Sequence, residues 1–249
     1  MNKILEIKNL SKKYHTKDGE IVAIKNINID ILEGEFVSLV GSSGCGKSTL
    51  LNIIAGLDKQ SEGDVTFFKD NPKIGYMFQS DCLFPWLTIY ENCLLGLKIQ
   101  NNNTKENQDY VLNLLKKYNL YDFKDKYPTC LSGGMKQRIA LIRTLALKPD
   151  ILLLDEPFNA LDYQSRLAIS NDVYEIIKKE KQTAIMVTHD ISEAVSMSSK
   201  VFVLSKRPCM VKKIYEIELE NRKDPISNRK DKRFMEFYEK IWKDLDVNV

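Results

Sequence analysis

The feature of this sequence that most constrains its fold is a glycine-rich loop at Gly41–Ser48, which reads GSSGCGKS and matches the pattern G-x-x-x-x-G-K-S. The apolar run Phe36–Val40 precedes the loop, and Thr49–Gly56, which has helical composition and ends in glycine, follows it. In the order strand, loop, helix, backbone N–H groups can surround phosphate oxygens at a helix N-terminus. We therefore predict a phosphate-binding loop, in which Lys47 reaches the β- and γ-phosphates and the Ser48 hydroxyl binds Mg²⁺.

A pair of carboxylates, Asp155 and Glu156, directly follows the apolar run Ile151–Leu154. Open α/β sheets bind ligands at the carboxyl ends of their strands, so the pair is expected beside the glycine loop. Asp155 is placed to hold Mg²⁺, directly or through water, and Glu156 to orient and deprotonate an attacking water. Taken alone, acidic residues after a strand also fit a surface loop.

His189 is one of two histidines in the chain and follows a third strand-like run, Ala184–Val187, through Thr188. It is therefore expected at the same edge of the sheet. Its imidazole can donate a hydrogen bond to a γ-phosphate oxygen while it contacts the base or its water, although a structural role is the alternative. The other histidine, His15, has no such setting and is expected in a solvated loop.

A second glycine-containing segment, Leu131–Arg138, reads LSGGMKQR. A helix that opens with Ser-Gly-Gly presents free N–H groups and a hydroxyl to an anion, so the segment is a candidate second phosphate-binding element. An N-cap followed by turn glycines would explain it equally well.

The pattern along the chain predicts an α/β fold with a mainly parallel sheet, because strand-like runs alternate with helical ones. Residues 4–7 and 21–31 alternate apolar and polar side chains and predict an antiparallel N-terminal β-subdomain. We expect a single domain, with a nucleotide-binding core at 1–79 and 131–206, a mainly helical inserted lobe at 80–130, and a charged tail at 207–249 that ends in an amphipathic helix around Phe234–Leu245.

Charge and cysteine content exclude several classes of protein. The net charge is +3, and the excess lies in the tail, which argues against a nucleic-acid partner because such proteins concentrate basic charge on a functional face. The five cysteines form no C-x-x-C pair, so neither a disulfide framework nor a zinc site is indicated. With no long apolar run and no signal-like N-terminus, the protein is expected in the cytoplasm, where any membrane role would come through a partner.

Taken together, these segments resemble the motifs of the ATP-binding cassette (ABC) family, in the family's order. The resemblance spans about residues 4–206. It rests on the P-loop, Q-loop, signature, Walker B, D-loop and H-loop, which correspond to Gly41–Ser48, Gln79, Leu131–Arg138, Ile151–Pro157, Asn159–Asp162 and Thr188-His189.

The resemblance implies ATP as the nucleotide and Mg²⁺ as the metal, with Ser48, Gln79 and Asp155 near the metal. It also implies that Tyr14 stacks on adenine, although a strand-end aromatic is the alternative. Gln79 would sense the γ-phosphate or Mg²⁺ and relay its state to a membrane partner. The residues implied to bind the nucleotide are Tyr14, Gly41, Ser42, Ser43, Gly44, Cys45, Gly46, Lys47, Ser48 and Thr49, and those implied in catalysis are Lys47, Gln79, Glu156 and His189.

A further implication is a head-to-tail homodimer. In this family the signature of one subunit completes the γ-phosphate site of the other, which assigns that role to Ser132, Gly133, Gly134 and Met135. Asp162 would run across the interface between the subunits.

The finer resemblance is to the ATPases of nitrate/sulfonate/taurine-type importers. It rests on Leu83–Thr88 with Glu91-Asn92, on Met135, on His189–Ala194 and on Leu204–Pro208. It implies a peripheral subunit at the cytoplasmic face of the cell membrane that works with a separate transmembrane permease and, indirectly, with an extracytoplasmic substrate-binding protein. Two positions depart from the common pattern, Asn159 in place of Ser and Cys209 in place of Gly.

Two other functions compete with an importer subunit. One is a non-transport ABC ATPase that acts mechanically on a macromolecular partner, which usually needs tandem cassettes or long coiled-coil arms. The other is a small-molecule kinase, which would leave Leu131–Arg138 and His189 without a role.

Overall fold

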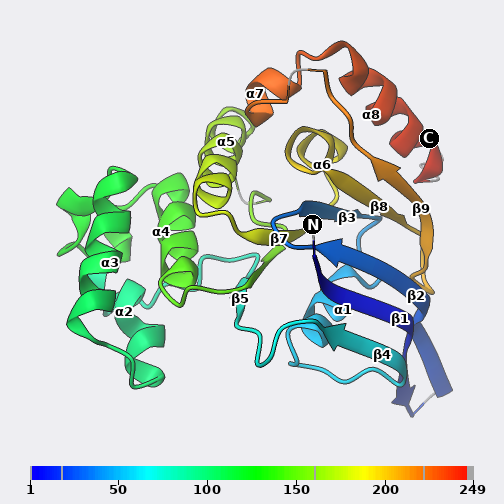
Figure 1. The fold of residues 1–249 in the computed structure, drawn as a ribbon, viewed down its shortest axis with the longest axis horizontal. Helices are drawn as coiled ribbons and strands as arrows, with labels where there is room; N and C mark the ends of the chain where they lie inside the picture. Colours follow the sequence, from blue (N-terminus) through cyan, green and yellow to red (C-terminus); the bar gives the residue numbers. More distant parts are fainter. Residues whose placement is uncertain (1, 18, 160, 221, 246–249) are drawn as a thin grey trace.

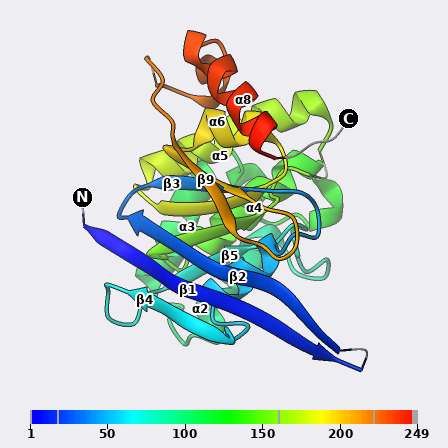
Figure 2. The same ribbon diagram turned by 90° about the vertical axis from the view of Figure 1, so that its right-hand side faces the viewer.

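The computed structural model describes residues 2–17, 19–159, 161–220 and 222–245. It consists of a large mixed sheet with a smaller antiparallel sheet and the helix Lys47–Ile54 on one side of it. Further helices cover the other side and one end (Figures 1 and 2). The strands are β1 Lys3–Thr16, β2 Gly19–Leu32, β3 Phe36–Val40, β4 Glu62–Phe67, β5 Ile74–Met77, β6 Ile151–Asp155, β7 Thr183–Thr188, β8 Lys200–Leu204 and β9 Val211–Glu216. The helices are α1 Lys47–Ile54, α2 Ile89–Ile99, α3 Lys105–Lys117, α4 Gly133–Leu145, α5 Tyr163–Lys179, α6 Ile191–Met197, α7 Pro225–Asn228 and α8 Lys232–Asp244, with short 3-10 turns at Tyr121–Phe123 and Pro128–Cys130.

The large sheet has the strand order β5-β6-β7-β3-β8-β9. The neighbours from β5 to β8 are parallel, and only β9 runs antiparallel to its neighbour β8. The predicted α/β fold with a mainly parallel sheet is therefore confirmed. Strands β6, β7 and β3 lie side by side, and each is followed by one of the predicted catalytic segments.

The smaller sheet has the order β2-β1-β4 and is antiparallel, as predicted for the N-terminal subdomain. Strand β1 extends well beyond the predicted residues 4–7, whereas β2 nearly matches the predicted 21–31. The prediction for His15 was wrong in one respect, because this residue lies within β1 and pairs with Glu20 across the hairpin. Its side chain is 83% exposed, so the expectation that it contacts solvent holds.

Alternation along the buried strands explains how the sheet is covered on both faces. Successive strand residues point to opposite faces, and accordingly Ile151 and Leu153 join the apolar core beneath the smaller sheet and α1. Leu152 and Leu154 join the other core, which α4 and α5 cover. A strand buried on both faces must be apolar throughout, which is why Ile151–Leu154 has no polar residue.

The inserted segment 80–130 contains α2 and α3, which lie away from the sheet in Figure 1. Helix α4, which follows this segment, packs against α2 on one side and α5 on the other. The three helices share one apolar core with the sheet face. Helix α4 thus joins the helical end of the molecule to the sheet.

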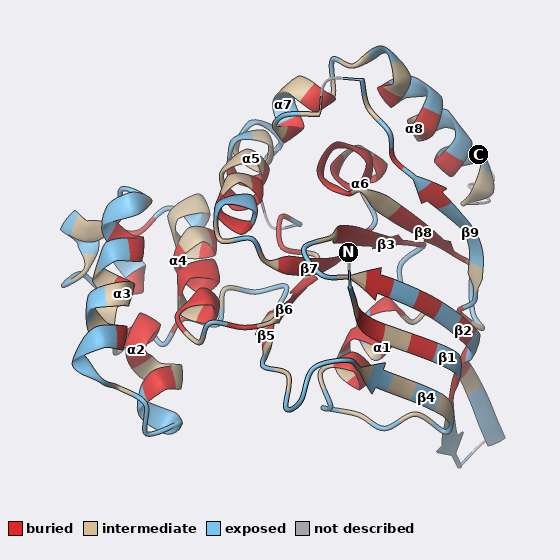
Figure 3. Ribbon diagram, viewed as in Figure 1, coloured by how far each residue is buried: buried red, intermediate tan, exposed pale blue. Residues whose placement is uncertain are grey.

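The C-terminal part returns to the sheet before it ends in α8. Strand β9, which was not predicted, adds an antiparallel edge because the chain turns back directly after β8. The predicted amphipathic helix is α8, whose inner residues Phe234, Phe237 and Ile241 are buried while its outer face is exposed (Figure 3). Across the described ranges, none of the helices combines the length and apolar character needed to cross a membrane.

Asn92 fixes the loop that leads into α2. Its side chain is fully buried and accepts a hydrogen bond from the Phe84 N–H at 2.8 Å. The same amide donates to the carbonyl oxygens of Phe84, Leu87 and Thr88 at 3.1, 3.1 and 2.9 Å. One side chain therefore contacts four backbone groups at the entry to α2. The Thr88 and Phe84 carbonyl oxygens also accept from the N–H groups of Asn92 and Leu87, at 2.9 and 3.1 Å.

We predict that Asn92→Ala lowers the free energy of unfolding by about 2 kcal/mol, because it removes several buried hydrogen bonds and leaves backbone groups without partners. Urea unfolding followed by circular dichroism measures the change. Asn113→Ala, at an exposed position of α3, is the matched control and should leave stability nearly unchanged. Equal stability of the two variants would contradict the role of Asn92.

Candidate active site

The glycine loop connects the end of β3 to the start of α1. Helix α1 begins at Lys47, two residues earlier than the predicted helical run, so Lys47 and Ser48 lie in its first turn. Gly46 has a φ of 127°, and a Cβ there would come 3.1 Å from Cys209 Cβ and 3.2 Å from the Ala23 carbonyl oxygen. The loop conformation therefore requires glycine at this position.

The side chain of Lys47 folds back over the start of the glycine loop. Its side chain is 4% exposed, and its ammonium donates hydrogen bonds to the carbonyl oxygens of Gly41 and Ser42 at 2.8 and 3.0 Å. Its Nζ lies 3.9 Å from Glu156 Oε1. The cation and the carboxylate therefore face the same space above the loop.

Asp155 occupies the last position of β6 and is contacted from two sides. Ser48 Oγ donates to its Oδ1 at 3.1 Å, and the Tyr76 hydroxyl donates to its Oδ2 at 3.2 Å. Burial raises the pKa of this carboxyl above its ordinary value, although the two hydrogen bonds oppose the change. Tyr76 also contacts Asn52 Oδ1, at 3.2 Å, and so ties β5 to α1.

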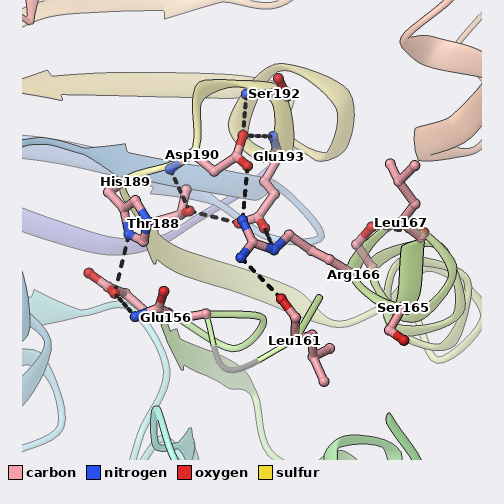
Figure 4. Close-up of polar contacts among 12 residues, drawn as sticks. Glu156, Leu161, Ser165, Arg166, Leu167, Thr188, His189, Asp190, Ser192 and Glu193 are labelled. Carbon is pink, nitrogen blue, oxygen red and sulfur yellow. Dashed lines mark hydrogen bonds and ion pairs between the residues drawn. The ribbon is translucent and has the colours of Figure 1, made fainter. Parts of the chain in front are cut away.

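Glu156 has a left-handed backbone, with a φ of 44°, a conformation that is uncommon for residues other than glycine and asparagine. Its N–H donates to the Val187 carbonyl at 2.9 Å, which fixes this turn against β7. Its Oε2 accepts a hydrogen bond from Asn159 Nδ2 at 3.1 Å and lies 3.3 Å from His189 Nδ1 (Figure 4). The predicted contact between His189 and the candidate base is therefore present.

Glu156 and the loop line one hollow, which we call the P-loop hollow. Gln79, from the segment after β5, also lines it, as do Asn159 and Arg207, to which the sequence analysis assigned no role in binding or catalysis. Its lining residues are Ser43, Gly44, Gly46, Lys47, Ser48, Thr49, Gln79, Glu156, Asn159 and Arg207. Ser48 and Gln79 bring oxygen atoms to this hollow, and the Asp155 carboxylate lies next to it, within hydrogen-bond distance of the Ser48 hydroxyl.

The residues of the signature segment lie in a different hollow, which we call the signature hollow. Ser132 is the N-cap of α4, and its Oγ accepts a hydrogen bond from the Met135 N–H at 3.3 Å. A Cβ on Gly134 would come 2.5 Å from Ile169 Cδ1, so a larger residue there would displace the Ile169 side chain where α4 packs on α5. The lining residues are Ser132, Gly133, Gly134, Met135, Arg138, Leu161, Asp162, Ser165, Ala168 and Ile169.

The two hollows have no residue in common. A single chain therefore brings Lys47, Ser48, Gln79, Glu156 and the Asp155 carboxylate to one site, and it places the signature and Asp162 at another. Asp162 is exposed and accepts a hydrogen bond from the Ser165 N–H at 3.1 Å, which caps α5.

Tyr14 belongs to neither hollow. It lies on β1 with 39% of its surface exposed, and its hydroxyl donates to Asp58 Oδ2 at 2.9 Å. The ammonium of Lys12 lies 4.8 Å from the centre of its ring. Stacking of Tyr14 on adenine stays a prediction.

Comparison with known proteins agrees with this geometry. The sequence profile of the family described as ABC transporter matches residues 24–159. The chain belongs to the ABC transporter family. The nitrate import ATP-binding protein NrtD of Synechocystis sp. is 42% identical over 243 residues, which cover 94% of this chain and 91% of that protein. The aliphatic sulfonates import ATP-binding protein SsuB of Bacillus cereus is 40% identical over 220 residues, 86% of each chain.

Among solved structures, the dimeric post-hydrolysis state of the ATP-binding cassette MJ0796 bound to ADP and Pi superposes with a TM-score of 0.73 and 36% identity. The match covers 86% of this chain and 99% of that one. The sequence-based assignment to the ATPases of the importer group is thereby confirmed, and the cassette is an ATPase that converts ATP and water to ADP and phosphate.

Sequence reasoning missed two residues of this cassette's site whose positions depend on distant parts of the chain. Arg207 Nη2 donates to the Gly44 carbonyl at 3.1 Å, because the turn between β8 and β9 returns to the glycine loop. Tyr76 reaches Asp155 because β5 is the neighbour of β6. Arg207 lies in the segment Leu204–Pro208 that carries the finer resemblance, but no local pattern places either residue at the nucleotide site. Asn159, in contrast, lies within a motif that the sequence analysis had quoted.

Behind His189, the cassette buries a carboxyl group on α6. Glu193 is 3% exposed, and its Oε2 accepts a hydrogen bond from Thr188 Oγ1 at 2.7 Å. Burial, and then repulsion from the Asp190 carboxylate, raise the pKa of Glu193 to about 7 from an ordinary value of 4.5. The folded protein therefore binds one proton more tightly than the unfolded chain does.

We predict that this proton makes stability depend on pH. Its contribution is fully present below pH 4.5 and is lost as the pH rises through about 7, because the folded state then has to ionise a buried group. The two pKa values correspond to a loss of about 3 kcal/mol. The urea midpoint should fall between pH 5 and 8 in the wild type, and this fall should be smaller in Glu193→Gln, which carries no titrating proton. Parallel curves for the two proteins would contradict the prediction.

Proposed function

We propose that the chain is the ATP-hydrolysing subunit of a multi-subunit importer and acts as a head-to-tail homodimer on a separate transmembrane permease. The observation that carries this proposal is the separation of the two hollows. One chain supplies a P-loop hollow with a base and a cation, together with a signature hollow that faces no nucleotide site of its own. Pairing of two chains would complete both sites.

Within the P-loop hollow, different groups of the chain bind the phosphates, accept the proton and orient the base. Backbone N–H groups of the loop and the Lys47 ammonium bind the phosphates. Glu156 accepts the proton of the attacking water while the new bond to the γ-phosphorus forms and the bond to the bridging oxygen of ADP breaks. His189 orients the Glu156 carboxylate and donates to a γ-phosphate oxygen.

The oxygen atoms in and beside the hollow fit Mg²⁺, which prefers oxygen ligands and retains part of its water. The Ser48 hydroxyl, the Asp155 carboxylate and the Gln79 amide would hold it, directly or through water. When bound, the ion neutralises charge on the β- and γ-phosphate oxygens. The Tyr76 hydroxyl keeps the Asp155 carboxylate oriented toward Ser48.

The segment between β5 and α2 is the candidate contact with the permease. Gln79 lies at its start, and Phe84 and Trp86, which are 37% and 69% exposed, lie beyond it with ring centres 5.2 Å apart. Asn92 holds the backbone of this loop. An aromatic pair on a fixed loop suits the packing of a short permease helix, and Gln79 connects that surface to the nucleotide.

The names of the two import relatives, for nitrate and for aliphatic sulfonates, support a small solute of that kind, such as nitrate, a sulfonate or taurine, as the cargo. The permease and an extracytoplasmic substrate-binding protein would select it, because the cassette does not contact the cargo. The cassette would work at the cytoplasmic face of the cell membrane as a peripheral subunit.

We predict that Glu156→Gln lowers hydrolysis by about 100-fold or more, since a neutral amide cannot accept the proton of the attacking water. ATP binding should remain, because the loop and Lys47 are unchanged. Phosphate release from the assembled complex and binding of a fluorescent ATP analogue measure the two effects. The control is Glu236→Gln on the exposed face of α8, which should behave as the wild type. Wild-type turnover in Glu156→Gln would show that another group is the base.

We predict that two inactive variants restore each other's activity if the signature acts on the partner subunit. Lys47→Ala removes the phosphate-binding cation, and Ser132→Arg blocks the signature hollow. Each homodimer should be inactive, whereas a hybrid dimer keeps one intact composite site. Phosphate release by the equimolar mixture therefore rises above that of either variant alone. A mixture as inactive as its components would contradict the head-to-tail arrangement.

A further inference from the structure

Arg166, in the first turns of α5, lies where two loops of the site meet (Figure 4). Its Nη2 donates to the Leu161 carbonyl at 3.2 Å, and its Nη1 lies 3.5 Å from Asp190 Oδ2. Its Nε lies 3.9 Å from Glu193 Oε1 and is buried without a hydrogen-bond partner. The guanidinium therefore faces three oxygens that belong to two segments far apart in the sequence.

On one side, Arg166 holds the segment that lines the signature hollow. Leu161 belongs to that hollow, and a Cβ on Gly133 would come 3.4 Å from Leu161 Cδ2. The next residue, Asp162, also lines the hollow. A movement of the signature against this segment would therefore displace the carbonyl that Arg166 binds.

On the other side, Arg166 holds the turn that carries His189. The Asp190 N–H donates to Thr188 Oγ1 at 3.0 Å, and Asp190 Oδ1 accepts from the Ser192 and Glu193 N–H groups at 2.7 and 3.1 Å. The residues before and after His189 are thus fixed to α6. The Asp190 carboxylate contacts both the N-terminus of this helix and the Arg166 guanidinium. The imidazole at the tip of this turn lies 3.3 Å from Glu156 Oε2.

We propose that Arg166 is a positioning residue that links the signature hollow to the catalytic pair His189 and Glu156 of the same chain. The inference rests on the proposed function, in which the signature hollow receives the nucleotide of the partner subunit. Occupancy of that hollow would then reach the chain's own catalytic pair through Leu161, Arg166 and Asp190. A planar guanidinium suits this task because it can contact several oxygens at fixed angles, whereas lysine offers one compact charge.

Kinetics test the link first. In Arg166→Gln, kcat for ATP hydrolysis should fall about tenfold, with KM for ATP changed less than about twofold, because the variant disturbs the base and leaves the phosphate-binding loop unchanged. The matched control, Lys179→Gln, removes one positive charge from the same helix at a position 56% exposed and should leave both constants unchanged. A second test combines Arg166→Gln with Asp190→Asn. If Arg166 acts through Asp190, the double variant should lose little more than the single variants do.

A spectroscopic readout separates positioning from general stability. The chain has two histidines, so the ring signals of His189 can be followed by NMR with His15, exposed on β1, as an internal reference. Arg166→Gln should shift the ring signals of His189 and leave those of His15 in place, whereas Lys179→Gln should shift neither. If Arg166→Gln does not fold, Arg166→Lys is the variant to use, because it keeps the charge and lacks the planar fork.

The proposal is overturned if a folded Arg166 variant keeps both the His189 signals and kcat of the wild type. This result is distinguishable from a failure of the proposed function, since the NMR measurement needs neither hydrolysis nor a permease. Wild-type turnover in Glu156→Gln, for example, would show that Glu156 is not the base. The NMR signals of His189 would still test the link between Arg166 and His189.

Discussion

The parallel pairing of β6, β7 and β3 is the constraint on which the site depends. Asp155 is opposite Val187, and Val40 is opposite Thr188, so the three strands end together. The residues that follow them are Glu156, His189 and the glycine loop, and none of these segments could meet through local folding. A shift of one residue in this register would turn alternate side chains to the other face and separate the base from the loop.

Burial at this edge of the sheet raises the pKa of two carboxyl groups. The pKa values of Asp155 and Glu193 are both raised, and in both cases burial is the largest cause. The two carboxyls differ in their partners, because Asp155 faces Ser48 and Tyr76 while Glu193 lies beside Thr188, Arg166 and Asp190. Asp155 thus lies beside the glycine loop, and Glu193 lies behind the turn that carries His189.

In the proposed homodimer, the arrangement of the two hollows would let one subunit respond to the other. The helix that begins at the signature packs on α5, and α5 carries Arg166 near its start. A rigid helix pair can transmit a small displacement from one hollow to a loop of the other because close-packed interfaces deform little. The polar contacts in Figure 4 provide the corresponding connection between the two loops.

The sequence by itself determined which residue types are available to bind and hydrolyse the nucleotide. The loop Gly41–Ser48, the acidic pair after Ile151–Leu154 and the histidine after Ala184–Val187 could be predicted as one site, because each motif follows a strand and parallel strands end at the same edge. The tertiary structure alone decided which supporting residues join them. Arg207 reaches Gly44 through a turn after β8, Tyr76 reaches Asp155 from a neighbouring strand, and Arg166 joins Leu161 to Asp190. These contacts join segments distant in sequence, and since each depends on how whole elements pack, no local periodicity or motif encodes it.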